Sequence, residues 1–338
     1  MRQVLADYNI ELMKWGDFLG SRDLRIEIAK HLYHTRSMMV SPDCIVIGSG
    51  IEYLYSRLIR ILPAGSIYAV ENPGYRKIPH IYEENVVHWT WVAMGEGGIH
   101  MSSLRESRAN VVHTSPEHHY PLGTVMTARR RQELLKWLEE KEERYLIEDD
   151  YDCEFRYHGR PISALYSLDQ SHHVIYMNTF SKTLSPAIRI SYIILPEHLL
   201  KKYVDTAGFF SNTSSNLEQY TLARFFKDGC FTRHLNHLRK FCHLQGKKLT
   251  ETIKNTPAIP CIQIRGIESG THLLIKLDTG LTDSKIKKRA EEKGIRLCCL
   301  SEFCIDDLPQ YQHTLVLNYT SMNAEQMQQV IQILGEIF

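Results

Sequence analysis

Between residues 43 and 195, short apolar runs rich in β-branched residues alternate with longer amphipathic stretches. Several of these runs are apolar on both faces, as strands must be when helices cover both sides of a sheet. Candidate strands lie at residues 44–48, 66–70, 86–91, 110–113, 144–147, 174–178 and 190–195, and the clearest helices between them at 51–62 and 127–140. This alternation predicts an α/β fold with a mostly parallel sheet sandwiched by helices.

After Pro196 the pattern changes. Three helices are expected at 197–205, 216–228 and 232–254, followed by a smaller alternation of strands and helices at 262–264, 272–277, 283–293, 295–299, 314–317 and 324–337. We therefore expect a large domain at residues 43–240 and a smaller α/β domain at 241–338. Residues 1–42 are expected to be an N-terminal segment that packs with the small domain.

Charge and cysteine content exclude several classes of protein. The chain carries 40 Lys and Arg against 39 Asp and Glu, a formal net charge of +1, without the dense basic run that a nucleic-acid groove needs. The eight cysteines form no C-x-x-C pair, and no apolar stretch approaches the roughly 20 residues of a membrane span. These features predict a reduced, cytoplasmic setting, no membrane span and no DNA binding by this chain alone.

A lysine follows the strand expected at 174–178, in the segment T-F-S-K-T-L-S-P-A-I-R. Lys182 can condense with an aldehyde, while Thr179, Ser181 and Arg189 offer donors to a phosphate dianion. The pattern indicates a Schiff base beside a bound phosphate. Taken alone, Lys182 also fits a solvated surface lysine, and Arg189 a surface ion pair.

A carboxylate cluster follows the strand expected at 144–147, in R-Y-L-I-E-D-D-Y-D. Ligands of parallel sheets bind where the strands end, so these acids are placed to act on one. Asp149 can keep a pyridine nitrogen protonated, and the phenol of Tyr151 can meet a ring hydroxyl. A metal-binding cluster or a helix cap remains an alternative for this segment.

Three further turns also follow expected strands. In I-G-S-G-I-E, free N–H groups of Gly50 and Ile51 at a helix start can bind a phosphate, although most such turns are only tight loops. In E-N-P-G-Y-R, Tyr75 can stack on a pyridine ring or serve as a core tyrosine. In S-P-E-H-H-Y-P-L-G, polar groups that include Tyr120 precede a rigid turn, and His118 with its neighbour completes no metal-ligand spacing. No metal site is predicted.

Together these segments resemble the MocR/GabR regulators, which fuse an aminotransferase-like domain to a winged-helix DNA-binding domain. The specific strings are D-D-Y-D-x-E-F and T-F-S-K-x-L-x-P-x-x-R-I-S-Y, and the likeness covers essentially the whole chain. The resemblance implies the fold type I of transferases dependent on pyridoxal 5′-phosphate (PLP), with a mixed, mostly parallel sheet and a smaller C-terminal domain. It also implies a head-to-tail homodimer with active sites near the subunit interface.

The same resemblance assigns roles to particular residues. It implies that Lys182 holds PLP, Asp149 pairs with the ring nitrogen and Tyr151 meets the ring hydroxyl. It further implies that Tyr75 stacks on the ring and that Arg189 binds the phosphate.

Two departures from the family pattern affect the functional expectation. The winged helix has no counterpart here, so DNA binding is expected only through a domain missing from this chain. Relatives commonly place an arginine for the ligand carboxylate after the last strand, where this chain has Thr320 or Ser321. The expected effector-binding residues are therefore Arg76, Lys77, His118 and Ser321.

The sequence thus predicts an effector-sensing and dimerisation domain of a transcriptional regulator. In this interpretation a small amino compound, such as an alanine-type amino acid, displaces Lys182 from the internal aldimine to form an external aldimine. The alternatives are a working class I/II aminotransferase, or a structural protein without cofactor.

Overall fold

A computed structural model of the chain describes residues 1–159, 162–320 and 322–338. Its larger sheet has eight strands in the order β1-β8-β7-β6-β5-β2-β3-β4. Strands β3, β2, β5, β6 and β7 run parallel, whereas β8 is antiparallel to both β7 and β1, and β4 is antiparallel to β3. The strands are β1 (Ile45–Ser49), β2 (Ile67–Asn72), β3 (His88–Gly95), β4 (Gly98–Ile99), β5 (Val111–Thr114), β6 (Tyr145–Asp149), β7 (Val174–Thr179) and β8 (Ile190–Ile194).

Each of the seven strands expected up to residue 195 forms, with displaced ends. The strand expected at 86–91 runs His88–Gly95 instead, because Val86 is exposed and adopts a positive φ of 56° in the turn after α5 (Lys77–Glu84). Helices α5 and α6 (Met101–Glu106) were not singled out in the sequence. The mixed sheet agrees with the prediction.

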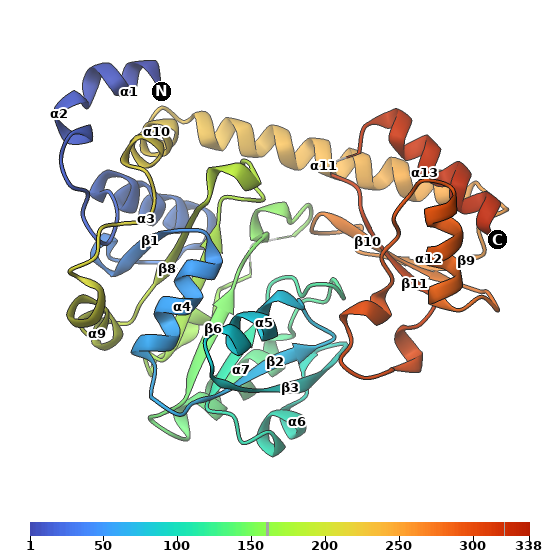
Figure 1. The fold of residues 1–338 in the computed structure, drawn as a ribbon, viewed down its shortest axis with the longest axis horizontal. Helices are drawn as coiled ribbons and strands as arrows, with labels where there is room; N and C mark the ends of the chain where they lie inside the picture. The colour runs from blue at the N-terminus through green and yellow to red at the C-terminus, as the bar shows by residue number, and fades with distance from the viewer. Residues whose placement is uncertain (160–161, 321) are drawn as a thin grey trace.

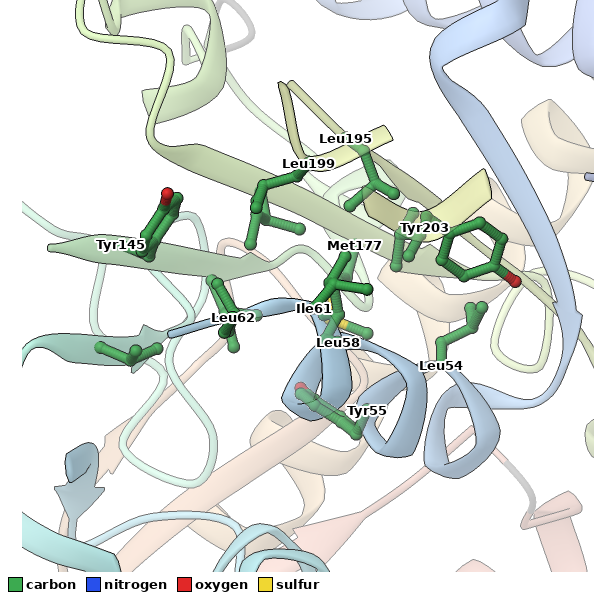
Figure 2. Packing of buried hydrophobic residues seen from close by; sticks show 14 of the residues in the cluster. Leu54, Tyr55, Leu58, Ile61, Leu62, Tyr145, Met177, Leu195, Leu199 and Tyr203 are labelled. Carbon is green, nitrogen blue, oxygen red and sulfur yellow. The ribbon is translucent and has the colours of Figure 1, made fainter. Parts of the chain in front are cut away.

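Alternate strand residues enter separate apolar clusters, so helices cover both faces of the sheet. Val46 packs with helices α4 (Ile51–Ile61) and α9 (Glu197–Ala207), whereas Ile45 and Ile47 pack on the opposite side. Figure 2 shows Leu54 and Leu58 of α4 beside Leu199 and Tyr203 of α9 over the strands. Helices α6 and α7 (Ala128–Glu139) cover another part through Leu104 and Trp137.

The second sheet is small and antiparallel, in the order β11-β10-β9. Its elements are β9 (Cys261–Arg265), β10 (His272–Leu277), α12 (Asp283–Glu292), β11 (Thr314–Asn318) and α13 (Ala324–Ile337). In Figure 1, α11 (Cys230–Lys254) extends from α10 (Asn216–Lys227) to this sheet. The predicted domain boundary at 240–241 falls inside α11, so it stays a prediction.

The prediction of a strand at residues 295–299 is wrong. Cys299 makes an isolated bridge to Leu315, and the backbone N–H of Val316 donates to the carbonyl of Cys298 at 2.8 Å. The chain turns at Cys299 into a 3₁₀ helix, Leu300–Phe303, so the segment touches β11 without forming a ladder.

The N-terminal segment does not pack as expected. Helices α1 (Arg2–Asp7) and α3 (Arg22–Arg36) contact α10, and Leu24, Ile28 and Leu32 of α3 are buried with strand residues of the large sheet. Figure 1 places this segment at the opposite end of the molecule from β9–β11. The assignment of residues 1–42 to the small domain is therefore wrong, because the apolar face of α3 is complementary to β1 and α10.

Within the ranges given above, none of the helices combines the length and the apolar character needed to cross a bilayer.

Candidate functional site

A cavity of about 460 Å³ opens where the parallel strands of the large sheet end. Most of the residues singled out from the sequence line this cavity, namely Ile51, Tyr75, Lys77, Tyr120, Asp149, Tyr151, Thr179, Ser181, Lys182 and Arg189. They come together because parallel strands place all their carboxyl ends at one edge of the sheet. The volume lies within the usual range of about 300–1,000 Å³ for ligand pockets.

Asp149 ends β6 at the base of the cavity and is 9% exposed. Its Oδ2 atom accepts a hydrogen bond from the Tyr55 hydroxyl at 3.0 Å, and His113 Nε2 lies 3.4 Å from the same atom. Its Oδ1 atom is buried and has no hydrogen-bond partner among the described residues. A buried carboxylate oxygen with a free lone pair is a suitable acceptor for a protonated ring nitrogen.

The Tyr151 hydroxyl lies 3.2 Å from His118 Nδ1, which is also 2.8 Å from Asp152 Oδ2. Burial raises the pKa of Tyr151 well above its ordinary value, and nearby Asp152 adds to this effect. Burial opposes protonation of His118, but the charge and hydrogen bond of Asp152 outweigh it and raise the pKa of His118. Tyr151 is therefore a neutral phenol held against a histidine–aspartate pair.

His118 does not lie where an effector-binding residue was expected. Its side chain is 3% exposed, faces the backbone of Gly270 and is not among the residues that line the cavity. Tyr151, whose hydroxyl lies 3.2 Å from His118 Nδ1, lines the cavity instead, and the effector-binding role of His118 stays a prediction.

Gly50, between β1 and α4, has φ +90° and ψ 163°, a conformation accessible almost only to glycine. A Cβ atom at this position would meet Arg189 Nη2 at 2.2 Å. Gly50 itself does not line the cavity, whereas Ile51 does. The missing side chain lets the guanidinium of Arg189 reach the start of α4, so the guanidinium and the free N–H groups of a helix start lie on one side of the cavity and can both donate to an anion.

The hydroxyls after β7 complete this polar corner. The Thr179 hydroxyl donates to Ser181 Oγ at 3.0 Å and accepts from the Ser191 hydroxyl at 2.9 Å. Lys182 follows directly and lines the same wall as Arg189. Helix N–H groups, two hydroxyls and a guanidinium form a donor set that fits a phosphate, and the adjacent amine fits an aldehyde on the same molecule.

Tyr75 and Tyr120 close another wall. Their rings meet edge to face, with centroids 5.9 Å apart and an interplanar angle of 86°. Tyr120 likewise meets Tyr151 at 6.4 Å and 86°. Tyr75 is 46% exposed, so one of its faces is open to a ligand ring.

The residues expected to hold an effector are dispersed. Lys77 lines the cavity, with Nζ 3.3 Å from Glu52 Oε1, but Arg76 does not, and its guanidinium donates to the Glu302 carbonyl at 2.8 Å. Thr320 lies outside the lining and donates from its hydroxyl to Asn318 Oδ1 at 3.0 Å. Ser321 lies outside the described residues.

Several residues of the site were missed by sequence reasoning. Glu52 and Glu71 stand inside motifs already noted, and His113 ends a predicted strand, so a signal existed for these three. Thr271 directly precedes β10 and Asn318 ends β11, both in the small domain, and no local pattern pointed to them. In residues 1–159, 162–320 and 322–338, no group of three or more His, Cys, Asp or Glu side chains is arranged to hold a metal ion.

Comparison with known proteins identifies the fold. The model of the family described as aminotransferase class I and II matches residues 6–334. An archaeal alanine:glyoxylate aminotransferase of 23% sequence identity superimposes with a TM-score of 0.86, over 100% of this chain and 85% of its own. The fold type I architecture expected from the sequence is confirmed.

Two relatives point to a particular branch. An uncharacterized HTH-type transcriptional regulator of Bacillus subtilis, YdeL, is 36% identical over 87% of this chain. The probable rhizopine catabolism regulatory protein MocR of Rhizobium meliloti is 27% identical over 94% of this chain. The chain spans 63% and 64% of the lengths of these two proteins. The chain therefore belongs to the aminotransferase class I and II family, and the resemblance to the MocR-type regulators is confirmed.

Proposed function

We propose that this chain is the PLP-binding, effector-sensing and dimerisation domain of a cytoplasmic transcriptional regulator of the MocR/GabR type. The observation that carries the proposal is that Lys182, Asp149 and Arg189 line one cavity in a chain whose relatives are HTH-type regulators. DNA binding would reside in a helix-turn-helix region like those named for the relatives.

Bound PLP would supply an aldehyde that captures amines and a ring that withdraws electrons. Arg189, Ser181, Thr179 and the start of α4 would bind its phosphate, and Asp149 Oδ1 would accept a hydrogen bond from its ring nitrogen. Tyr75 would cover one face of the ring, and Tyr151 would donate to the ring hydroxyl. Lys182 would hold the aldehyde carbon covalently until an amine ligand replaced it.

The ligand would be a small amino compound, because the cavity holds about 460 Å³ and the cofactor fills part of it. The cations along the described lining are Lys77, Lys182 and Arg189, and the last two are committed to the cofactor in this proposal. Lys77, which also lies 3.3 Å from Glu52 Oε1, is then the cation that Glu52 and a ligand carboxylate would share, with Asn318 and Thr271 as neutral polar partners. A single flexible ammonium is a weaker anchor than a bidentate guanidinium, which favours reversible sensing over efficient transamination.

The covalent step has a direct test. Protein incubated with PLP and then freed of unbound cofactor is expected to absorb in the visible range, and borohydride reduction followed by peptide mass spectrometry should place the cofactor on Lys182. Lys182→Ala should abolish both signals, while the exposed Lys202→Ala serves as the control. A colourless wild-type protein without an adduct at Lys182 would contradict the proposal.

A second candidate is a working aminotransferase, favoured by the presence of Lys182 beside Asp149 and Tyr151 in the cavity. In that function Lys182 would also move a proton between the ligand α-carbon and the cofactor. Incubation with a panel of amino acids separates the two functions. Sustained keto-acid production would establish the enzyme, and a spectral change without product would establish the sensor.

A further inference from the structure

Glu52 lies among the residues proposed to bind the cofactor phosphate, which we call the phosphate corner (Arg189, Ser181, Thr179 and the start of α4). It lies in the first turn of α4, and its Oε2 atom accepts a hydrogen bond from Arg189 Nη2 at 2.8 Å. Its Oε1 atom lies 3.3 Å from Lys77 Nζ. Both Glu52 and Arg189 line the cavity, so the guanidinium proposed to bind the cofactor phosphate already carries a carboxylate partner.

Glu52 is ionised at neutral pH. Burial opposes ionisation, but a backbone hydrogen bond at the helix start and the charge of Arg189 outweigh it, so the pKa of Glu52 lies below its ordinary value. An ionised carboxylate offers only acceptors, as does a phosphate dianion. The two anions would therefore share one guanidinium and repel each other.

We propose that Glu52 competes with the cofactor phosphate for Arg189 and thereby keeps cofactor binding weak enough for occupancy to follow the cofactor concentration. The inference rests on the proposed function, because it concerns the same phosphate corner. It makes the cofactor a regulatory ligand in its own right, alongside the amino compound that reacts with it.

Lys77 gives the displaced carboxylate a second partner. Its ammonium is on the cavity side of α5, and its side chain is 60% exposed. Glu52 can keep an ion pair with Lys77 while it yields Arg189 to a phosphate. When a phosphate enters, Glu52 then loses its ion pair with Arg189 but keeps its ion pair with Lys77.

The experiment compares two aldehydes that differ only in the phosphate, PLP and pyridoxal. Dissociation constants are measured by absorbance for the wild type, Glu52→Gln and Glu52→Ala. Glu52→Gln removes the charge and adds an amide donor, whereas Glu52→Ala removes the carboxylate with the rest of the side chain beyond Cβ and adds no donor. Glu139→Gln, at the exposed end of α7 and outside the cavity lining, controls for the change in net charge.

Both Glu52 variants are expected to bind PLP more tightly, on the order of tenfold (about 1.4 kcal/mol), since each removes a like charge near the bound anion. The affinity of both Glu52 variants for pyridoxal should stay unchanged. Glu139→Gln should bind PLP and pyridoxal as tightly as the wild type does. Unchanged or weaker PLP binding by both variants would overturn the inference, and weaker binding would indicate that Glu52 orients Arg189. If neither aldehyde bound the wild type, the proposed function itself would fail.

Discussion

The two sheets of this protein both contain buried apolar strands, but charged side chains are buried beside the large sheet and not beside the small one in the residues that the structure describes. Under the large sheet, Arg36 of α3 lies 3.0 Å from Asp150 and 3.6 Å from Glu117, with all three side chains at most 5% exposed. In the described part of residues 241–338, the buried polar side chains are Thr250, Thr271, Thr314 and His272, and burial beside His118 lowers the pKa of His272 to about 3. The small domain therefore has a neutral interior.

This difference follows from sheet topology. Parallel strands end at one edge, so polar residues after successive strands converge there and bring buried charges with them. The antiparallel β9–β11 sheet has no such shared edge, and it contributes only the neutral Thr271 and Asn318 to the cavity. We therefore expect the large domain to control the affinity for the cofactor and the small domain to adjust the affinity for the amino-compound ligand.

The largest expected effect comes from breaking the buried charge cluster. Arg36→Met removes the cation 3.0 Å from Asp150 and leaves Glu117 with only the more distant Arg131 and Arg156, so it should lower the free energy of unfolding by about 3–5 kcal/mol. Urea denaturation measures the free energy of unfolding of the variant and of the wild type. Arg22→Met is the control, because the exposed Arg22 pairs with Asp43 at 65% and 60% exposure and should change stability by less than about 1 kcal/mol. Equal effects of both variants would contradict the comparison.

Truncation in the small domain should separate stability from cofactor binding. Leu273→Ala creates a cavity at a fully buried position of β10 and should cost about 2–5 kcal/mol, with a central expectation near 3. The PLP dissociation constant, measured where the variant remains folded, should stay within about twofold of wild type. A large loss of PLP affinity would mean that the small domain also shapes the cofactor site.

The pH dependence of stability should reveal the buried acids of the large domain. Burial raises the pKa of Glu71 from 4.5 to about 7, despite a hydrogen bond from the Thr114 hydroxyl. Between pH 4.5 and 7 the folded state keeps a proton that the unfolded state has lost, so stability falls as pH rises, by up to about 1.4 kcal/mol per pH unit. Glu71→Gln should make the free energy of unfolding, measured by urea denaturation, depend less steeply on pH in this range. Part of the slope should remain, because burial also raises the pKa of Asp150 to about 7.

Glu302 provides the control for this titration. Burial opposes its ionisation, but the hydrogen bond and charge of Lys287 and the hydrogen bond from the Cys299 N–H together outweigh burial and lower the pKa of Glu302. Its contribution is present above the ordinary pKa and is lost as pH falls. Glu302→Gln should therefore leave the slope between pH 4.5 and 7 intact, and flattening by this variant would refute the assignment to Glu71.

The smallest expected effect concerns ligand affinity and the side chains that the small domain contributes to the cavity lining. Asn318→Ala removes one neutral hydrogen-bonding group worth about 0.5–1.5 kcal/mol, so an amino-acid ligand should bind about 2- to 10-fold more weakly. PLP affinity should stay unchanged. Asn255→Ala, exposed after the end of α11 and outside the lining, should alter neither value, and absorbance titration of the PLP-loaded protein with the ligand compares the two variants.

Sequence reasoning was strongest where a local pattern repeats. Lys182, Asp149, Tyr151 and Arg189 were found because each follows an apolar strand in a polar turn, and parallel strands bring such turns together. It failed where a side chain is sequestered by distant residues. His118 stands in a polar turn like the others, but Asp152 and Gly270 enclose it.

The sequence by itself determined the alternation of strands and helices, and with it the edge of the sheet where the cofactor chemistry gathers, because periodicity and turn residues act over a few positions. Only the tertiary structure decided that α3 covers β1, that Asn318 rather than Thr320 lines the cavity and that Glu52 meets Arg189. Glu52 and Arg189 are 137 residues apart. Such a contact depends on how the packed sheet orients two turns, which no local pattern encodes.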